Sequence, residues 1–175
     1  MTFLVPFDGS PLSRAALARA RLYALALDAA PPGLRREVLR EGPLQVLAVA
    51  VVPEHERYAR EKGWIAPGEP FTVERVVADL HRQVVEVDPG ASFDVERVDA
   101  TATAGTISGR LRRRAEAAEV SVVFIGSENA GRIVAPLSSV GAGVAAATDY
   151  DVHLVRRRLP PTAGRRLRSE FFLVD

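Results

Sequence analysis

The sequence contains no cysteine among its 175 residues. This absence excludes a disulfide framework, a thiolate zinc site and a cysteine nucleophile. Long apolar runs are missing too, since the longest, Val46 to Val52, is far shorter than the roughly 20 residues of a membrane-spanning helix. The first residues carry neither a basic region nor a long apolar core, so we expect no signal peptide and a cytoplasmic protein.

The sequence also has almost no net charge, with 23 basic against 22 acidic residues. A net charge of +1 argues against a nucleic-acid partner. The charge is uneven, because residues 156–175 hold six arginines against two acids, which gives +4 on a remainder of −3. Lysine is nearly absent as well, since Lys62 is the single lysine against 22 arginines. We attribute this excess of arginine to GC-rich coding.

What the sequence does have is the composition of one globular domain, 47% apolar and 26% charged. Apolar runs between turn residues predict strands at 3–5, 44–52, 93–98, 120–125 and 151–155. Helical patterns predict helices at 12–27, 34–40, 73–87, 103–118 and 138–148, and residues 53–70 form an irregular insertion. This alternation predicts an α/β fold: a single three-layer open sheet of five mostly parallel strands with helices on both faces.

The predicted helices have distinct faces. Ser10 and Pro11 suit the N-cap and first turn of the helix at 12–27. Its narrow polar stripe, Arg14, Arg21 and Asp28, indicates that most of its circumference is packed. The helix at 73–87 is amphipathic. Its apolar residues are Val73, Val76, Val77, Leu80, Val84 and Val87.

Open α/β sheets bind ligands beyond the carboxyl ends of their strands. We therefore expect residues 6–10, 51–53 and 126–140 to meet there. Asp8 follows the first strand, where it is either a turn and cap residue or an acceptor of hydrogen bonds from a nucleoside. Small and hydroxyl residues from Gly126 to Val140 suit either phosphate binding or an ordinary loop with a serine cap.

The sequence has few signs of standard nucleotide-binding motifs, of a catalytic nucleophile or of a metal site. There is no Walker motif, no G-x-G-x-x-G after the first strand and no nucleophile elbow. The three histidines, His55, His81 and His153, have no metal-ligand spacing. We therefore predict no catalytic residue and no metal site, and an enzymatic role such as slow ATP hydrolysis ranks third among our hypotheses.

The segments with the clearest patterns resemble the universal stress protein family over about residues 2–156. Residues 3–10 resemble its opening "ILVPVDGS", residues 122–127 its "LIVMGS", and residues 151–155 its closing strand. The resemblance implies a five-stranded α/β domain, often a homodimer through the last strand, that binds ATP or AMP, with magnesium only where ATP is bound.

The same resemblance suggests which residues hold the nucleotide. Pro6, Asp8 and Val51 would surround the adenosine, and Ile125 leads into the phosphate loop. Nucleotide-binding members have the loop pattern G-x2-G-x9-G-S/T. Gly126 matches its first glycine, and Asn129 stands at the second. The third glycine and the serine or threonine after it fall on Ser139 and Val140. If one residue is deleted after Leu137, they fall on Ser138 and Ser139 instead.

Two functional hypotheses follow. The first is a homodimeric stress-response or signalling protein that binds an adenine nucleotide in a domain of residues 1–156. The second is a dimerisation module of the same fold without nucleotide, which the departures from the glycine pattern favour. The basic tail, 157–175, is either without fixed structure or packs its Phe171–Phe172 pair on the body, the dimer mate or a protein partner.

Overall fold

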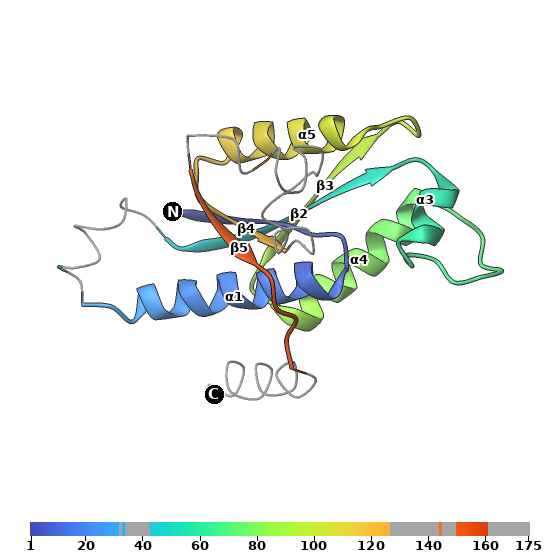
Figure 1. Cartoon of the computed structure of the whole chain (residues 1–175). Helices are drawn as coiled ribbons and strands as arrows, with labels where there is room; N and C mark the ends of the chain where they lie inside the picture. Colours follow the sequence, from blue (N-terminus) through green and yellow to red (C-terminus); the bar gives the residue numbers. More distant parts are fainter. Residues whose placement is uncertain (32, 34–42, 127–143, 145–149, 161–175) are drawn as a thin grey trace.

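The computed structural model describes residues 1–31, 33, 43–126, 144 and 150–160. They build one sheet with the order β3-β2-β1-β4-β5, in which every neighbouring pair is parallel (Figure 1). The strands are β1 (Thr2–Pro6), β2 (Gln45–Pro53), β3 (Ser92–Val98), β4 (Val120–Gly126) and β5 (Asp151–Val155). The predicted α/β fold is confirmed, and the described strands are wholly rather than mostly parallel.

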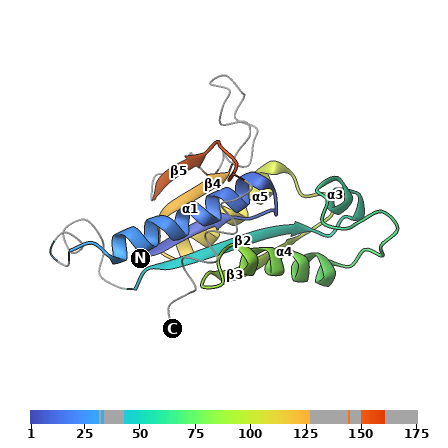
Figure 2. The same ribbon diagram turned by 90° about the horizontal axis from the view of Figure 1, so that it is seen from below.

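Helices cover both faces of the sheet, as predicted. α1 (Pro11–Asp28) and α4 (Val73–Val87) lie on one face and α5 (Ala104–Ala117) on the other, and the view from below shows α1 and α4 side by side (Figure 2). The predicted helix at 34–40 lies outside the described residues, and so does all of the one at 138–148 except Val144.

The central strands are buried on both sides, as their continuous apolar runs predicted. Phe3 and Val5 face the core under α1 and α4, whereas Leu4 between them faces the core under α5. β2 alternates in the same way, with Ala48 and Ala50 on the first side and Val49 on the second. Period-two alternation within an apolar strand is what a sheet covered on both faces requires.

α1 departs from its predicted burial at its C-terminal end. Its first three turns are nearly all buried, but Leu22 and Tyr23 are exposed. The reason is the helix face rather than its length: Leu22, Tyr23 and Ala26 share one side of α1 and are exposed, whereas Ala20 and Ala24 on the side toward the sheet are buried. Tyr23 instead packs its ring edge-on against Phe124 and His153, at 5.4 and 5.2 Å between centroids.

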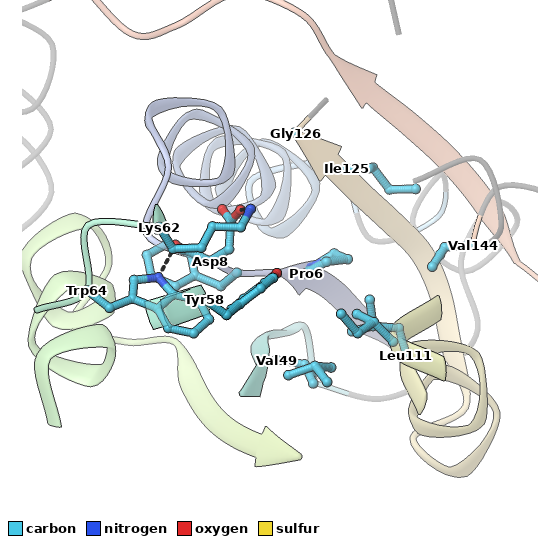
Figure 3. Close-up of a pocket in the computed structure, with 13 residues that line it drawn as sticks. Pro6, Asp8, Val49, Tyr58, Lys62, Trp64, Leu111, Ile125, Gly126 and Val144 are labelled. Carbon is cyan, nitrogen blue, oxygen red and sulfur yellow. Dashed lines mark hydrogen bonds and ion pairs between the residues drawn. The ribbon is translucent and has the colours of Figure 1, made fainter. Parts of the chain in front are cut away.

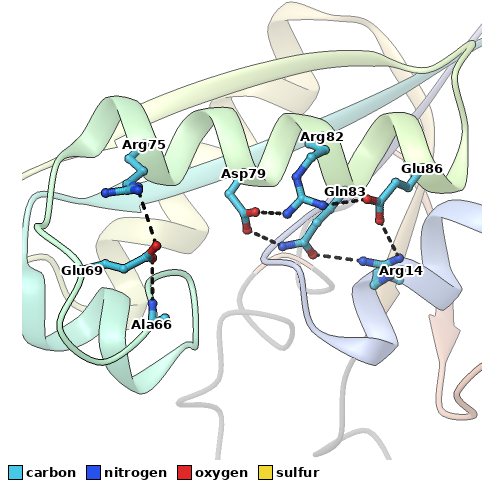
Figure 4. Close-up of polar contacts among 8 residues, drawn as sticks. All are labelled: Arg14, Ala66, Glu69, Arg75, Asp79, Arg82, Gln83 and Glu86. Atoms are coloured by element: carbon cyan, nitrogen blue, oxygen red, sulfur yellow. Dashed lines mark hydrogen bonds and ion pairs between the residues drawn. The ribbon is translucent and has the colours of Figure 1, made fainter.

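Polar contacts fix α4 against α1. The guanidinium of Arg14 donates to Gln83 Oε1 at 3.2 Å and to Glu86 Oε2 at 3.3 Å (Figure 4). Further along, Arg21 pairs with the fully buried carboxylate of Asp88 at 2.8 Å. A buried carboxylate that lost the cation paired with it would be costly, so the Arg21–Asp88 pair constrains how the two helices meet.

The insertion predicted as irregular contains a helix, α3 (Glu56–Glu61). His55 caps it by accepting from the amide of Tyr58 at 3.1 Å, and Glu56 pairs with Arg60 one turn later at 2.6 Å. Arg60 also donates to the carbonyls of Ala66 and Glu69, which ties the following loop down. Six residues are too few for hydrophobic periodicity to indicate a helix, which is why the sequence pattern missed it.

The end of β4 touches the backbone of α1. A Cβ at position 126 would lie 2.3 Å from the carbonyl oxygen of Leu12 and 2.6 Å from the amide nitrogen of Ser13. Such distances are far inside van der Waals contact, and backbone atoms cannot rotate away. Glycine at 126 is therefore explained by strand-to-helix packing before any ligand is considered.

Gly126→Ala should destabilise the fold by about 3 kcal/mol, the upper end of the range for overpacking, since α1 must shift as a body. The melting temperature should fall by roughly 6–12 °C. Gly109→Ala in α5 is the matched control, because an added Cβ there meets nothing within 4 Å. It should raise the melting temperature slightly, as Gly→Ala does inside helices. Equal melting temperatures for the two variants would contradict this packing account.

Candidate functional site

A cavity of about 140 Å³ lies at the carboxyl ends of β1, β2 and β4. β1 is the point where the strand order reverses, with β2 on one side and β4 on the other, so this is the switch point of the sheet. The described residues that line it are Pro6, Phe7, Asp8, Val49, Val51, Tyr58, Lys62, Trp64, Ile107, Leu111, Ile125, Gly126 and Val144. These residues come from the strands β1, β2 and β4, the helix α5, the turn after β1, the insertion and position 144, and Figure 3 shows them around one space.

Five residues predicted from the sequence meet at this cavity: Pro6, Asp8, Val51, Ile125 and Gly126. The other four predicted site residues lie outside the described residues; they are Asn129, Ser138, Ser139 and Val140. Three strand ends therefore converge as expected within the described part of the chain.

The turn after β1 holds Asp8 through short-range contacts. Its carboxylate accepts from the amide of Ser10 at 3.1 Å, and the Ser10 side chain caps α1 by accepting from Ser13 at 3.2 Å. Gly9 between them has φ +74°, and a side chain there would strike Gln83 Oε1. The turn role proposed for Asp8 is confirmed, whereas the N-cap of α1 is Ser10, and the same turn points the Asp8 carboxylate at the cavity mouth.

Asp8 is paired with Lys62, the C-cap residue of α3. Lys62 Nζ lies 3.0 Å from Asp8 Oδ2. Burial raises the pKa of Asp8, but hydrogen bonding to Ser10 and the charge of Lys62 outweigh burial, so that pKa lies below its ordinary value. Burial lowers the pKa of Lys62, and the charge of Asp8 outweighs it, so that pKa lies above its ordinary value. Both groups stay charged from about pH 5 to pH 9.

Two aromatic residues of the insertion cover the same turn. The indole N–H of Trp64 donates to the backbone carbonyl of Asp8 at 2.8 Å. Tyr58 packs edge-on against Trp64 with 5.5 Å between ring centroids, and Lys62 Nζ lies 5.8 Å above the Tyr58 ring. In Figure 3 the Asp8 carboxylate and the Lys62 ammonium lie side by side above these two rings.

The cavity thus combines apolar walls with a small polar mouth. Strand and helix side chains such as Val49, Leu111 and Ile125 form the walls, while Asp8 and Lys62 supply the charges. Apolar walls with a few placed polar groups are the usual character of a small-molecule site, and in this cavity the polar groups make up a large share of the lining. An engineered apolar cavity of about 150 Å³ admits benzene, so this space of similar volume, which is partly open to solvent, has room for a ring system of that order.

The sequence interpretation missed the three residues that the insertion contributes: Tyr58, Lys62 and Trp64. Residue composition, rather than hydrophobic periodicity, could have pointed to them. The chain has one tryptophan and one lysine, and both fall in the insertion that follows the predicted strand at 44–52. The described residues contain no group of three or more histidines, aspartates or glutamates that could hold a metal ion.

The helices of the described ranges include none with the length and apolar character that crossing a bilayer requires. No protein-family model and no curated protein matches the sequence.

Solved structures do match the fold. A universal stress protein in complex with cAMP is 16% identical, with 89% of this chain and 96% of that chain covered and a TM-score of 0.50. A universal stress family protein from Burkholderia pseudomallei is 17% identical, with 89% and 96% covered and a TM-score of 0.47. The first match has the same kind of α/β sheet over nearly its whole length, as the sequence resemblance predicted. The chain therefore has the universal stress protein fold.

Proposed function

We propose that this chain is a stress-response or signalling protein that binds an adenine nucleotide, ATP or AMP, in the cavity at the carboxyl ends of β1, β2 and β4. The observation that supports this most directly is the placement of Asp8. A short turn fixes its carboxylate at the mouth of a ring-sized apolar cavity, beside the switch point of the sheet. A base in the cavity would leave the ribose at the mouth, within reach of that carboxylate.

The polar mouth suits the rest of a nucleotide. A carboxylate accepts hydrogen bonds from ribose hydroxyls, and an ammonium offers donors to phosphate. The structural neighbour in complex with cAMP supports an adenine ligand for this chain as well. In this proposal Gly126 and the predicted loop residues Asn129, Ser138, Ser139 and Val140 lie toward the phosphates, with magnesium present only where ATP is bound.

AMP should bind nearly as well as ATP. Asn129 stands where the resemblance predicts the second glycine of the phosphate loop. That departure bears mainly on the distal phosphates, which only ATP has. The binding energy then comes chiefly from the base, the ribose and the nearest phosphate.

We also propose a cytoplasmic homodimer that pairs through β5. β5 is an edge strand of the described sheet, and its sequence, Asp151 to Val155, has three apolar residues. The opposite edge, β3, carries Asp94, Glu96 and Arg97, charges that discourage strand pairing. A twofold contact between two β5 strands closes both edges at once. Residues 1–156 then form the binding domain and 157–175 a basic tail.

Asp8→Asn should weaken AMP binding about tenfold in calorimetry. A hydrogen bond to a charged group is worth about 1.5–3 kcal/mol, and partial exposure places Asp8 at the low end. Asp94→Asn is the matched control, because its side chain is 38% exposed against 37% for Asp8 and it also pairs with a basic side chain, that of Arg114. Its position on β3 is away from the cavity, so AMP affinity should not change.

The nucleotide proposal fails if the wild-type protein shows neither heat nor a thermal shift with millimolar ATP, ADP or AMP, with and without magnesium. In that case the second hypothesis, a dimerisation module without nucleotide, replaces it. Equal losses for Asp8→Asn and Asp94→Asn would show that the cavity mouth is not where the nucleotide binds.

Leu154→Arg should convert the homodimer to a monomer in light scattering at micromolar concentration, because it places like charges on both strands of the twofold pair. Val85→Arg on α4 is the matched control, since both side chains are 43% exposed. It should leave the dimer intact. A wild-type protein that is monomeric at these concentrations would overturn the assembly proposal.

A further inference from the structure

The cavity mouth is electrically balanced, and the balance depends on one residue. Among the described lining residues, Asp8 is the one acid and Lys62 the one base. Lys62 is also the single lysine of the chain. Without it, an anionic ligand approaching the mouth would meet the carboxylate of Asp8 alone, and like charges at such short range repel.

The ammonium of Lys62 has donors to spare. It carries three N–H groups, and Asp8 Oδ2 accepts one of them at 3.0 Å. The side chain lies along Tyr58 at the rim and is part of the cavity lining. The remaining donors are therefore placed where a group at the mouth of the cavity would sit.

The insertion holds Lys62 at this point from several sides. The amide of Lys62 donates to the carbonyl of Tyr58 at 3.0 Å, which closes the end of α3. Two residues later, Trp64 is buried and donates its indole N–H to Asp8. The backbone at Lys62 is thus tied to the turn that carries Asp8, and the ion pair with the Asp8 carboxylate holds the ammonium at the cavity mouth.

We propose that Lys62 determines ligand specificity: it donates a hydrogen bond to the phosphate nearest the ribose, and so makes the site select an anionic nucleotide over the neutral nucleoside. This inference rests on the proposed nucleotide function, and it assigns a part of the nucleotide to the carboxylate of Asp8 and another to the ammonium of Lys62. Asp8 contacts the ribose or base, and Lys62 contacts the first phosphate. The ligand class it predicts is a nucleoside carrying at least one phosphate.

The test is calorimetry with adenosine and with AMP on the full chain. Lys62→Met keeps the apolar stem and removes the charge, and should weaken AMP binding about tenfold while leaving adenosine within about twofold. Lys62→Arg should retain most of the preference for AMP. Arg75→Met is the matched control: its side chain is 48% exposed against 38% for Lys62, it pairs with Glu69, and it is not a lining residue. It should change neither affinity.

A double-mutant cycle separates direct contact from an effect through Asp8. In an Asp8→Asn background, the loss of AMP affinity on Lys62→Met should persist, because the phosphate contact does not need the carboxylate. If that loss disappears, Lys62 acts only by neutralising Asp8 and the proposed contact is wrong. Equal losses for adenosine and AMP in the single variant also overturn it, since they indicate a structural role.

The failure of this inference differs from the failure of the proposed function. Wild-type protein that binds neither adenosine nor AMP contradicts both. If the wild-type protein binds both ligands equally well, only the proposed role of Lys62 is contradicted, and the proposed nucleotide site is not. Melting temperatures within about 3 °C of wild type for Lys62→Met and Lys62→Arg would confirm that the variants fold.

Discussion

The parallel alignment of the strands is the constraint on which the site depends. Because β1, β2 and β4 run in one direction, their carboxyl ends meet at the same edge of the sheet. With β1 in the middle, the connection after β1 runs through α1 on one face of the sheet and the connection into β4 runs through α5 on the other, and the cavity lies at the ends of these strands. The apolar residues that hold the strands together, such as Val49 and Ile125, are also the walls of that space.

A cavity at this place is common in α/β sheets, and here the insertion between β2 and α4 adds polar and aromatic side chains to its lining. The residues of the insertion reach back to the turn after β1, where Trp64 contacts the backbone of Asp8 and Lys62 its carboxylate. The ion pair is half exposed, so it adds little to stability, about 0–1 kcal/mol for such pairs. Its effect is on the charge of the cavity mouth, which becomes neutral and therefore tolerant of an anion.

Much of the fold was predictable because its signals are local. Continuous apolar runs such as Val46 to Val52 identify buried strands, and the Ser10–Pro11 pair identifies the start of α1 without reference to the rest of the chain. The Asp8 turn was predictable for the same reason, since its main contact is with Ser10, two residues away.

The remainder of the site depends on tertiary contacts that no local pattern encodes. Lys62 and Trp64 are more than 50 residues from Asp8 in sequence, and only the folded insertion brings them together. α3 was not predicted because six residues are too few to show a helical period. The exposure of Tyr23 was not predicted because an apolar residue can lie on either face of a helix, and only the packing of α1 on the sheet decides which face is buried.

Binding of an adenine ring in the cavity beside Asp8 can be tested at a single atom. Trp64 is the one tryptophan, so its indole N–H gives one resonance in a nitrogen-15 correlation spectrum, and that N–H lies at the cavity. Titration with AMP should shift this resonance to saturation, with the same affinity that calorimetry gives. An indole resonance that stays unchanged while AMP binds with measurable heat would place the ligand elsewhere and contradict the account.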